Sequence, residues 1–92
     1  MSILTKIPVR NEEYSYRIID DQIIIIDPLT NKIKLLNAVA ATIWLSIDGK
    51  NSVNDILQII LDKFNVEPEK AELDLTKFLQ ELMNANLIKF EE

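Results

Sequence analysis

The residues that could do chemistry in this chain are almost all carboxylates, because its 92 residues include no His and no Cys. Their absence removes thiolate nucleophiles, imidazole acid–base catalysis and the usual zinc and iron ligands. Asp20 and Asp21 could suggest a two-carboxylate site, but their place between two strand-like runs favours a turn. We therefore expect a protein that is not an enzyme and that needs no metal or other cofactor.

Charge and hydropathy narrow the choice of partners. The formal net charge is -5, and the excess of acidic residues lies in the part of the chain after residue 65. An acidic surface does not attract nucleic-acid phosphates, so we expect no nucleic-acid partner. The longest uninterrupted aliphatic run, residues 23–26, is far too short to span a bilayer. We expect no membrane association and a soluble, cytoplasmic protein.

The elements that must position any site are organised around residues 35–44, which hold the only Trp. Asn37 is a suitable N-cap, and Val39, Ile43 and Ile47 then recur at the spacing of one helical face. We expect Trp44 to lie in the core and Gly49 to take the left-handed conformation at the end of this helix.

Three strands precede this helix, at residues 14–19, 22–27 and 32–36. Their alternating or aliphatic patterns and short connections indicate an antiparallel meander. In the third strand, Ile33 and Leu35 face one way while Lys32 and Lys34 face the other, and Lys34 is expected to face solvent. Residues 1–11 show little pattern, and Pro8 limits any strand there to an edge or an arm.

Two further helices follow. Ser52 and Asp55 have the spacing of a capping box at the start of the second, and Pro68 suits the first turn of the third. Residues 87–90 are expected to form a short extended segment that packs back on the core. The expected fold is a single α+β domain of winged-helix-like architecture, with a three-stranded antiparallel sheet followed by three helices.

The order of several short motifs is similar to that of one known family. Asp27-Pro28 precedes the third strand, and Leu36-Asn37-x-x-Ala40-Ala41-x-Ile43-Trp44 begins the first helix. Asp48-Gly49, Ser52-Val53 and Phe64-x-Val66 then follow in order. Over residues 14–88 this pattern resembles the PqqD family, whose members include the peptide-recognition domains of pathways that modify ribosomally made peptides.

This resemblance implies a non-catalytic adaptor. Such domains bind the leader segment of a precursor peptide as an added β-strand beside the third strand, in a groove completed by the third helix. They present the peptide to a modifying enzyme, often a radical S-adenosylmethionine enzyme, or to a leader peptidase. The corresponding residues here are Lys32, Ile33, Lys34, Leu35 and Leu36 on the strand and Asp74, Phe78, Glu81 and Leu82 on the helix.

Other interpretations stay open at this point. Asp74 and Glu81 are also typical of a solvated helix face with no binding role. A winged-helix arrangement is common in nucleic-acid-binding regulators, although the third helix is acidic and the chain has no basic stripe. A domain that only dimerises is a further alternative.

Overall fold

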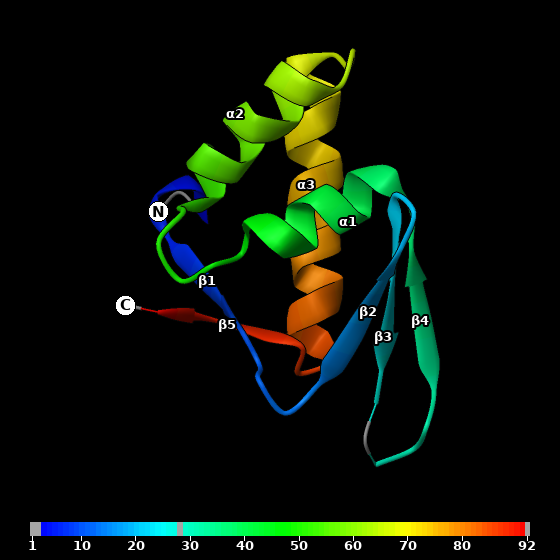
Figure 1. Ribbon diagram of the computed structural model, residues 1–92. Helices are drawn as coiled ribbons and strands as arrows, with labels where there is room; N and C mark the ends of the chain where they lie inside the picture. The colour runs from blue at the N-terminus through cyan, green and yellow to red at the C-terminus, as the bar shows by residue number, and fades with distance from the viewer. Residues whose placement is uncertain (1–2, 28, 92) are drawn as a thin grey trace.

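Two antiparallel sheets and three helices make up the fold (Figure 1). The structure is a computed structural model that describes residues 3–27 and 29–91. A short 3-10 turn, η1 (Ile3–Thr5), precedes the first strand. The expected order of three paired strands followed by three helices is confirmed, with one additional strand at each end. The elements are β1 (Ile7–Arg10), β2 (Ser15–Ile19), β3 (Gln22–Ile26), β4 (Ile33–Leu36), α1 (Ala38–Ser46), α2 (Val53–Lys63), α3 (Pro68–Asn84) and β5 (Ile88–Glu91).

The larger sheet has the strand order β2-β3-β4, with both pairs antiparallel. Asp20 and Asp21 form the two-residue turn between β2 and β3, and Asp20 has a positive φ of 56°. Such turns commonly need positive φ values, which Asp tolerates better than most residues. The interpretation of this acidic pair as a turn is therefore confirmed.

The isoleucine run of β3 occupies the centre of this sheet, so its side chains reach both faces. Ile23 and Ile25 are buried, at 0% and 2% exposed, and face the helices. Ile24 and Ile26 point to the opposite face and are half-buried.

The second sheet joins the two ends of the chain. β1 pairs with β5 in antiparallel register, with Pro8 opposite Phe90. Proline is tolerated because each strand of a two-stranded sheet is an edge strand. The sequence suggested an edge strand or an arm for residues 1–11. In the structure, residues 7–10 are a paired strand with Pro8 fully buried.

The first two helices begin at the N-cap residues that the sequence predicted. The Asn37 side chain accepts a hydrogen bond from Ala40 N–H at 3.0 Å, and Ser52 with Asp55 forms a complete capping box. The end of α1 differs from expectation, because Ile47 is its C-cap and its N–H donates to the Trp44 carbonyl. Gly49, with φ 81°, lies two residues beyond that cap, in the bend that leads to α2.

The core lies between the helices and the inner face of the larger sheet. Trp44 lies at the centre of this core and is 1% exposed. Its ring contacts the Tyr16 ring edge-on, with the ring centroids 5.8 Å apart. The expectation that Trp44 is a core residue is confirmed. No helix of the described residues is long and apolar enough to cross a membrane.

Candidate functional site

Among residues 3–27 and 29–91, no strand pairs with the outer edge of β4, so this edge is free. β4 pairs with β3 on one side and ends the sheet. Asp27 N–H donates to the Lys32 carbonyl at 2.9 Å, and the register makes Ile25–Lys34 and Ile23–Leu36 the next hydrogen-bonded pairs. The N–H and C=O groups of Ile33 and Leu35 therefore point away from β3. They can pair with another strand.

The side chains of β4 alternate as the sequence predicted, but their environments differ from expectation. Ile33 and Leu35 are 66% and 61% exposed, whereas Leu36 is 2% exposed in the core. Lys34 shares the inner face with Leu36 and is half-buried. The expectation that Lys34 faces solvent is therefore wrong. In β4 it is the aliphatic side chains of Ile33 and Leu35 that are exposed.

A cavity of about 340 Å³ lies beyond the C-terminal end of β4, between α1 and α3. Asn37, Val39 and Ala40 contribute from the start of α1, and Asp74 and Phe78 from α3. Most of the lining side chains are apolar. Asp74 forms an exposed ion pair with Lys70 at 3.4 Å on the rim. The shape and chemistry suit a bulky apolar side chain.

A second, smaller cavity of about 140 Å³ lies at the opposite end of β4. Lys32, Ile33 and Lys34 line it from the strand, and Ala85 and Leu87 line it just after α3. β4 and α3 run in opposite directions (Figure 1). The smaller cavity borders the segment just after α3, whereas the larger one borders residues 70–78 of the helix. We call the free edge of β4 together with these two cavities the β4–α3 groove.

The structure brings together some of the predicted site residues and not others. Asp74 and Phe78 line the larger cavity, and Lys32, Ile33 and Lys34 line the smaller one. Glu81 is exposed but lines neither. Leu36 and Leu82 are 2% and 0% exposed, so both side chains belong to the hydrophobic core.

Sequence reasoning missed the contribution of α1. Val39 and Ala40 lie in the stretch that the sequence marked as the centre of the core, and both are half-buried beside α3. The small side chain of Ala40 signalled a close approach of a neighbouring element. In the structure, Ala40 instead borders an open cavity.

Asp27 holds the loop that leads into β4. Its Oδ1 accepts a hydrogen bond from Leu29 N–H and its Oδ2 one from the Thr30 hydroxyl, both at 2.9 Å. These bonds, that of Leu29 first, lower the pKa of the Asp27 carboxyl from its ordinary value of 3.8, and the charge of Lys32 acts in the same direction. The carboxylate form therefore stabilises the loop at neutral pH.

Substitution of Asp27 should change the response of the fold to acid. A lowered pKa contributes stability above the unfolded-state value, and that contribution is lost as the pH falls through the folded-state value. Below pH 3.8 we therefore expect the wild type to lose stability more steeply than Asp27→Asn, which has no proton to take up there. Urea midpoints at neutral pH and in acid measure this. Asp62→Asn controls for net charge, and equal acid losses in wild type and Asp27→Asn would contradict the role assigned to Asp27.

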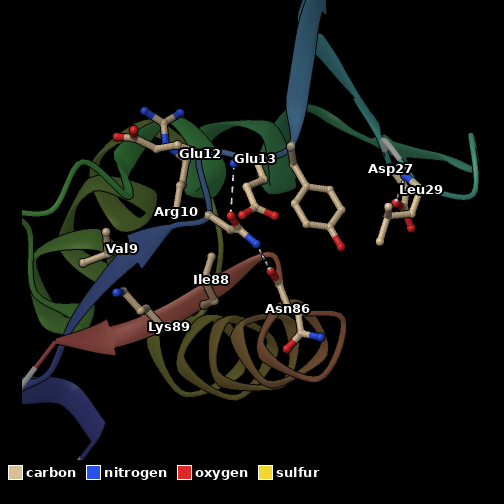
Figure 2. A pocket seen from close by; sticks show the side chains of 11 residues that line it. Val9, Arg10, Glu12, Glu13, Asp27, Leu29, Asn86, Ile88 and Lys89 are labelled. Carbon is tan, nitrogen blue, oxygen red and sulfur yellow. Dashed lines mark hydrogen bonds between the residues drawn. The ribbon is translucent and has the colours of Figure 1, made fainter.

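A larger cavity, of about 740 Å³, lies elsewhere, between the β1–β5 sheet and the β3–β4 loop. Figure 2 shows charged side chains of both signs around it, with Arg10 and Lys89 on one side and Asp27 across the opening. Asn11 connects its walls, since its side chain donates to the Asn86 carbonyl at 2.8 Å. This hollow borders the smaller cavity of the groove, because Tyr14 and Asp27 line both.

Comparisons with known proteins identify the family and the fold. The PqqD family model, described as coenzyme PQQ synthesis protein D, matches residues 22–88. The solved structure of TbiB1 in complex with the TbiA(beta) leader peptide has 25% sequence identity and a TM-score of 0.79, covering 88% of this chain and 94% of that one. Lasso peptide synthetase B1 complexed with the leader peptide has 22% identity and a TM-score of 0.78, covering 90% of this chain and 98% of that one.

No protein in a search of curated sequences matched this chain. The family model nevertheless covers β3, β4, all three helices and the start of β5. That span includes both sides of the β4–α3 groove. The chain belongs to the PqqD family.

Proposed function

We propose that this protein is a non-catalytic adaptor that binds the leader segment of a ribosomally made precursor peptide. The leader adds as a strand to the free edge of β4, in the β4–α3 groove. The observation that carries the proposal is the unpaired edge at Ile33 and Leu35, flanked at both ends by cavities. Two structures of this fold were determined with leader peptides, which supports the same ligand class here.

Most of the binding free energy must come from leader side chains that enter the cavities. Pairing about five leader residues forms about five main-chain hydrogen bonds, each worth roughly 1 kcal/mol net. Ordering those residues costs about 1–2 kcal/mol each, so backbone pairing alone nearly cancels. A Leu or Phe side chain that becomes fully buried contributes about 1.5–3 kcal/mol. The leader must therefore insert at least one such side chain.

The two cavities also predict a spacing in the leader. Five residue steps separate Lys32, at the smaller cavity, from Asn37, at the larger one. At the rise of a β-strand this is about 17 Å. Because side chains on the same face of a strand have an even spacing, a paired leader should place its bulky apolar anchor about four or six residues from the side chain that enters the smaller cavity. The ammonium groups of Lys32 and Lys34 favour an acidic side chain there.

The partner that receives the peptide is a maturation enzyme, either a radical S-adenosylmethionine enzyme or a leader peptidase. An adaptor of this kind needs no reactive groups of its own, and the chain has no His or Cys to supply them. The exposed acidic residues of α3 disfavour the alternative of a nucleic-acid-binding regulator, because a helix in the major groove faces phosphates.

Isothermal titration of the chain with a synthetic leader peptide tests the proposal. We expect one peptide per chain, and Lys34→Glu should weaken binding several-fold because it reverses charge in the smaller cavity. Asp74→Lys, at the rim of the larger cavity, should also lower the affinity. Lys77→Glu is the matched control, since Lys77 is exposed on α3 and lines neither cavity. Equal affinities for wild type, Lys34→Glu and Asp74→Lys would place the leader outside the β4–α3 groove.

A further inference from the structure

The outer face of the larger sheet, which points away from the core, is unusually apolar for a surface. Ile19, Ile33 and Leu35 are 49%, 66% and 61% exposed on it, and Ile24 and Ile26 between them are half-buried. The register makes the patch continuous, because Ile24 lies opposite Leu35 and Ile26 opposite Ile33. Contiguous apolar surface of this kind is typical of an interaction site.

Charge on this outer face is confined to one side chain. By strand alternation, Ser15, Arg17, Gln22 and the five aliphatic residues share the face, and Arg17 is the charged member. Arg17 is exposed and lies opposite Ile24. In a chain of net charge -5, this face therefore presents one cation amid aliphatic surface. It complements an apolar surface that carries a carboxylate.

The size of the outer face argues against a second copy of the chain as its occupant. Three strands of about five residues cover roughly 200 Å². Stable interfaces bury about 800 Å² of accessible surface on each partner, which is more than a footprint of this size provides. A second copy would also bring another Arg17 and no acidic group. A partner with further contacts outside this face fits better.

The outer face is continuous with the proposed leader site, because β4 belongs to both. A leader strand paired with β4 would extend the sheet and direct alternate side chains to the outer face, beside Ile33 and Leu35. The surface available to a partner would then include both proteins. This extended surface exists only when the adaptor is loaded.

We propose that the outer face of β2-β3-β4 docks the maturation enzyme, and that a bound leader strengthens this docking by completing the surface. The enzyme supplies an apolar patch with a carboxylate that pairs with Arg17. This inference rests on the proposed leader-binding function and adds a way for the enzyme to distinguish loaded from empty adaptor.

Binding measurements with the purified maturation enzyme that acts on the same precursor test the inference. Its affinity for the adaptor is measured with and without saturating leader peptide, for wild type, Arg17→Glu and Ile24→Thr. We expect leader to tighten docking at least tenfold and each substitution to weaken it at least tenfold. Neither residue lines the β4–α3 groove, so leader affinity should stay within twofold. Lys50→Glu, an equal charge change between α1 and α2, should leave docking unchanged.

The outcomes separate this inference from the proposed function. A wild-type chain that fails to bind leader contradicts the proposed function. If leader binds normally but the enzyme docks to both variants as tightly as to the wild type, or equally to empty and loaded adaptor, the docking inference is wrong. Sedimentation of the chain alone gives the remaining outcome: a dimer that Ile24→Thr converts to a 10.6 kDa monomer would show that a second copy occupies the face, which also overturns the inference.

Discussion

Leu35→Pro should strongly weaken leader binding while leaving the fold intact. The N–H of Leu35 points to the free edge of β4, so proline removes no hydrogen bond of the β3–β4 ladder. Its ring occupies the place where a leader carbonyl would accept that N–H. Loss of one bond and displacement of the strand around it should weaken leader affinity more than tenfold, or about 1.4 kcal/mol. Fluorescence anisotropy with a labelled leader peptide measures the change.

The opposite edge of the same sheet provides a matched control. The two-residue turn makes Ile19–Gln22 the closing hydrogen-bonded pair, so the N–H of Ile18 points to the free edge of β2. Ile18 is also exposed, at 59%. Ile18→Pro therefore imposes the same backbone change on the other edge, and leader binding should survive. The reverse result, in which Ile18→Pro abolishes binding and Leu35→Pro does not, would move the leader to β2.

Ala40→Leu should have the second largest effect, because it fills the larger cavity from its α1 wall. Ala40 is half-buried, and leucine nearly equals alanine as a helix former. The added side chain occupies the space that the apolar anchor of the leader would enter. We expect leader affinity to fall tenfold or more, with an unfolding midpoint equal to or slightly above that of the wild type.

Ala38→Leu controls for adding the same side chain to the same helix. Ala38 is half-buried and lines a different cavity, beside Asp21 and Leu45 on the other side of α1. The Ala38→Leu variant should bind leader with the affinity of the wild type. Equal binding by Ala40→Leu would mean that the larger cavity is not an anchor site.

Much of the fold could be predicted from sequence because its signals are local. Asn37 and Ser52 cap the helices that they were expected to cap, and the Asp20-Asp21 turn sets the β2–β3 hairpin. The β1–β5 sheet could not be predicted in the same way. The extended segment expected at residues 87–90 is present within β5 (Ile88–Glu91). Its partner β1, however, lies about 80 residues away in the chain, and Pro8 disfavours most strands.

The candidate site was only partly predictable, for a different reason. The free edge of β4 follows from strand order, which the short connections indicate. Which helix residues border that edge depends on how α1 and α3 cross the sheet. Helical spacing therefore identified Asp74 and Phe78 but also included Leu82, which is fully buried, and it overlooked Ala40. The half-burial of Lys34 likewise depends on the neighbouring segment after α3.

Amide hydrogen exchange with and without leader peptide reports directly on whether the leader pairs with the free edge of β4. In the free protein the Lys34 and Leu36 amides already bond to β3, whereas those of Ile33 and Leu35 face the open edge. We expect leader binding to slow exchange at Ile33 and Leu35 and to leave the edge amides of β2, Tyr16 and Ile18, unchanged. Protection that arises at Tyr16 and Ile18, with Ile33 and Leu35 still exchanging freely, would contradict pairing at β4.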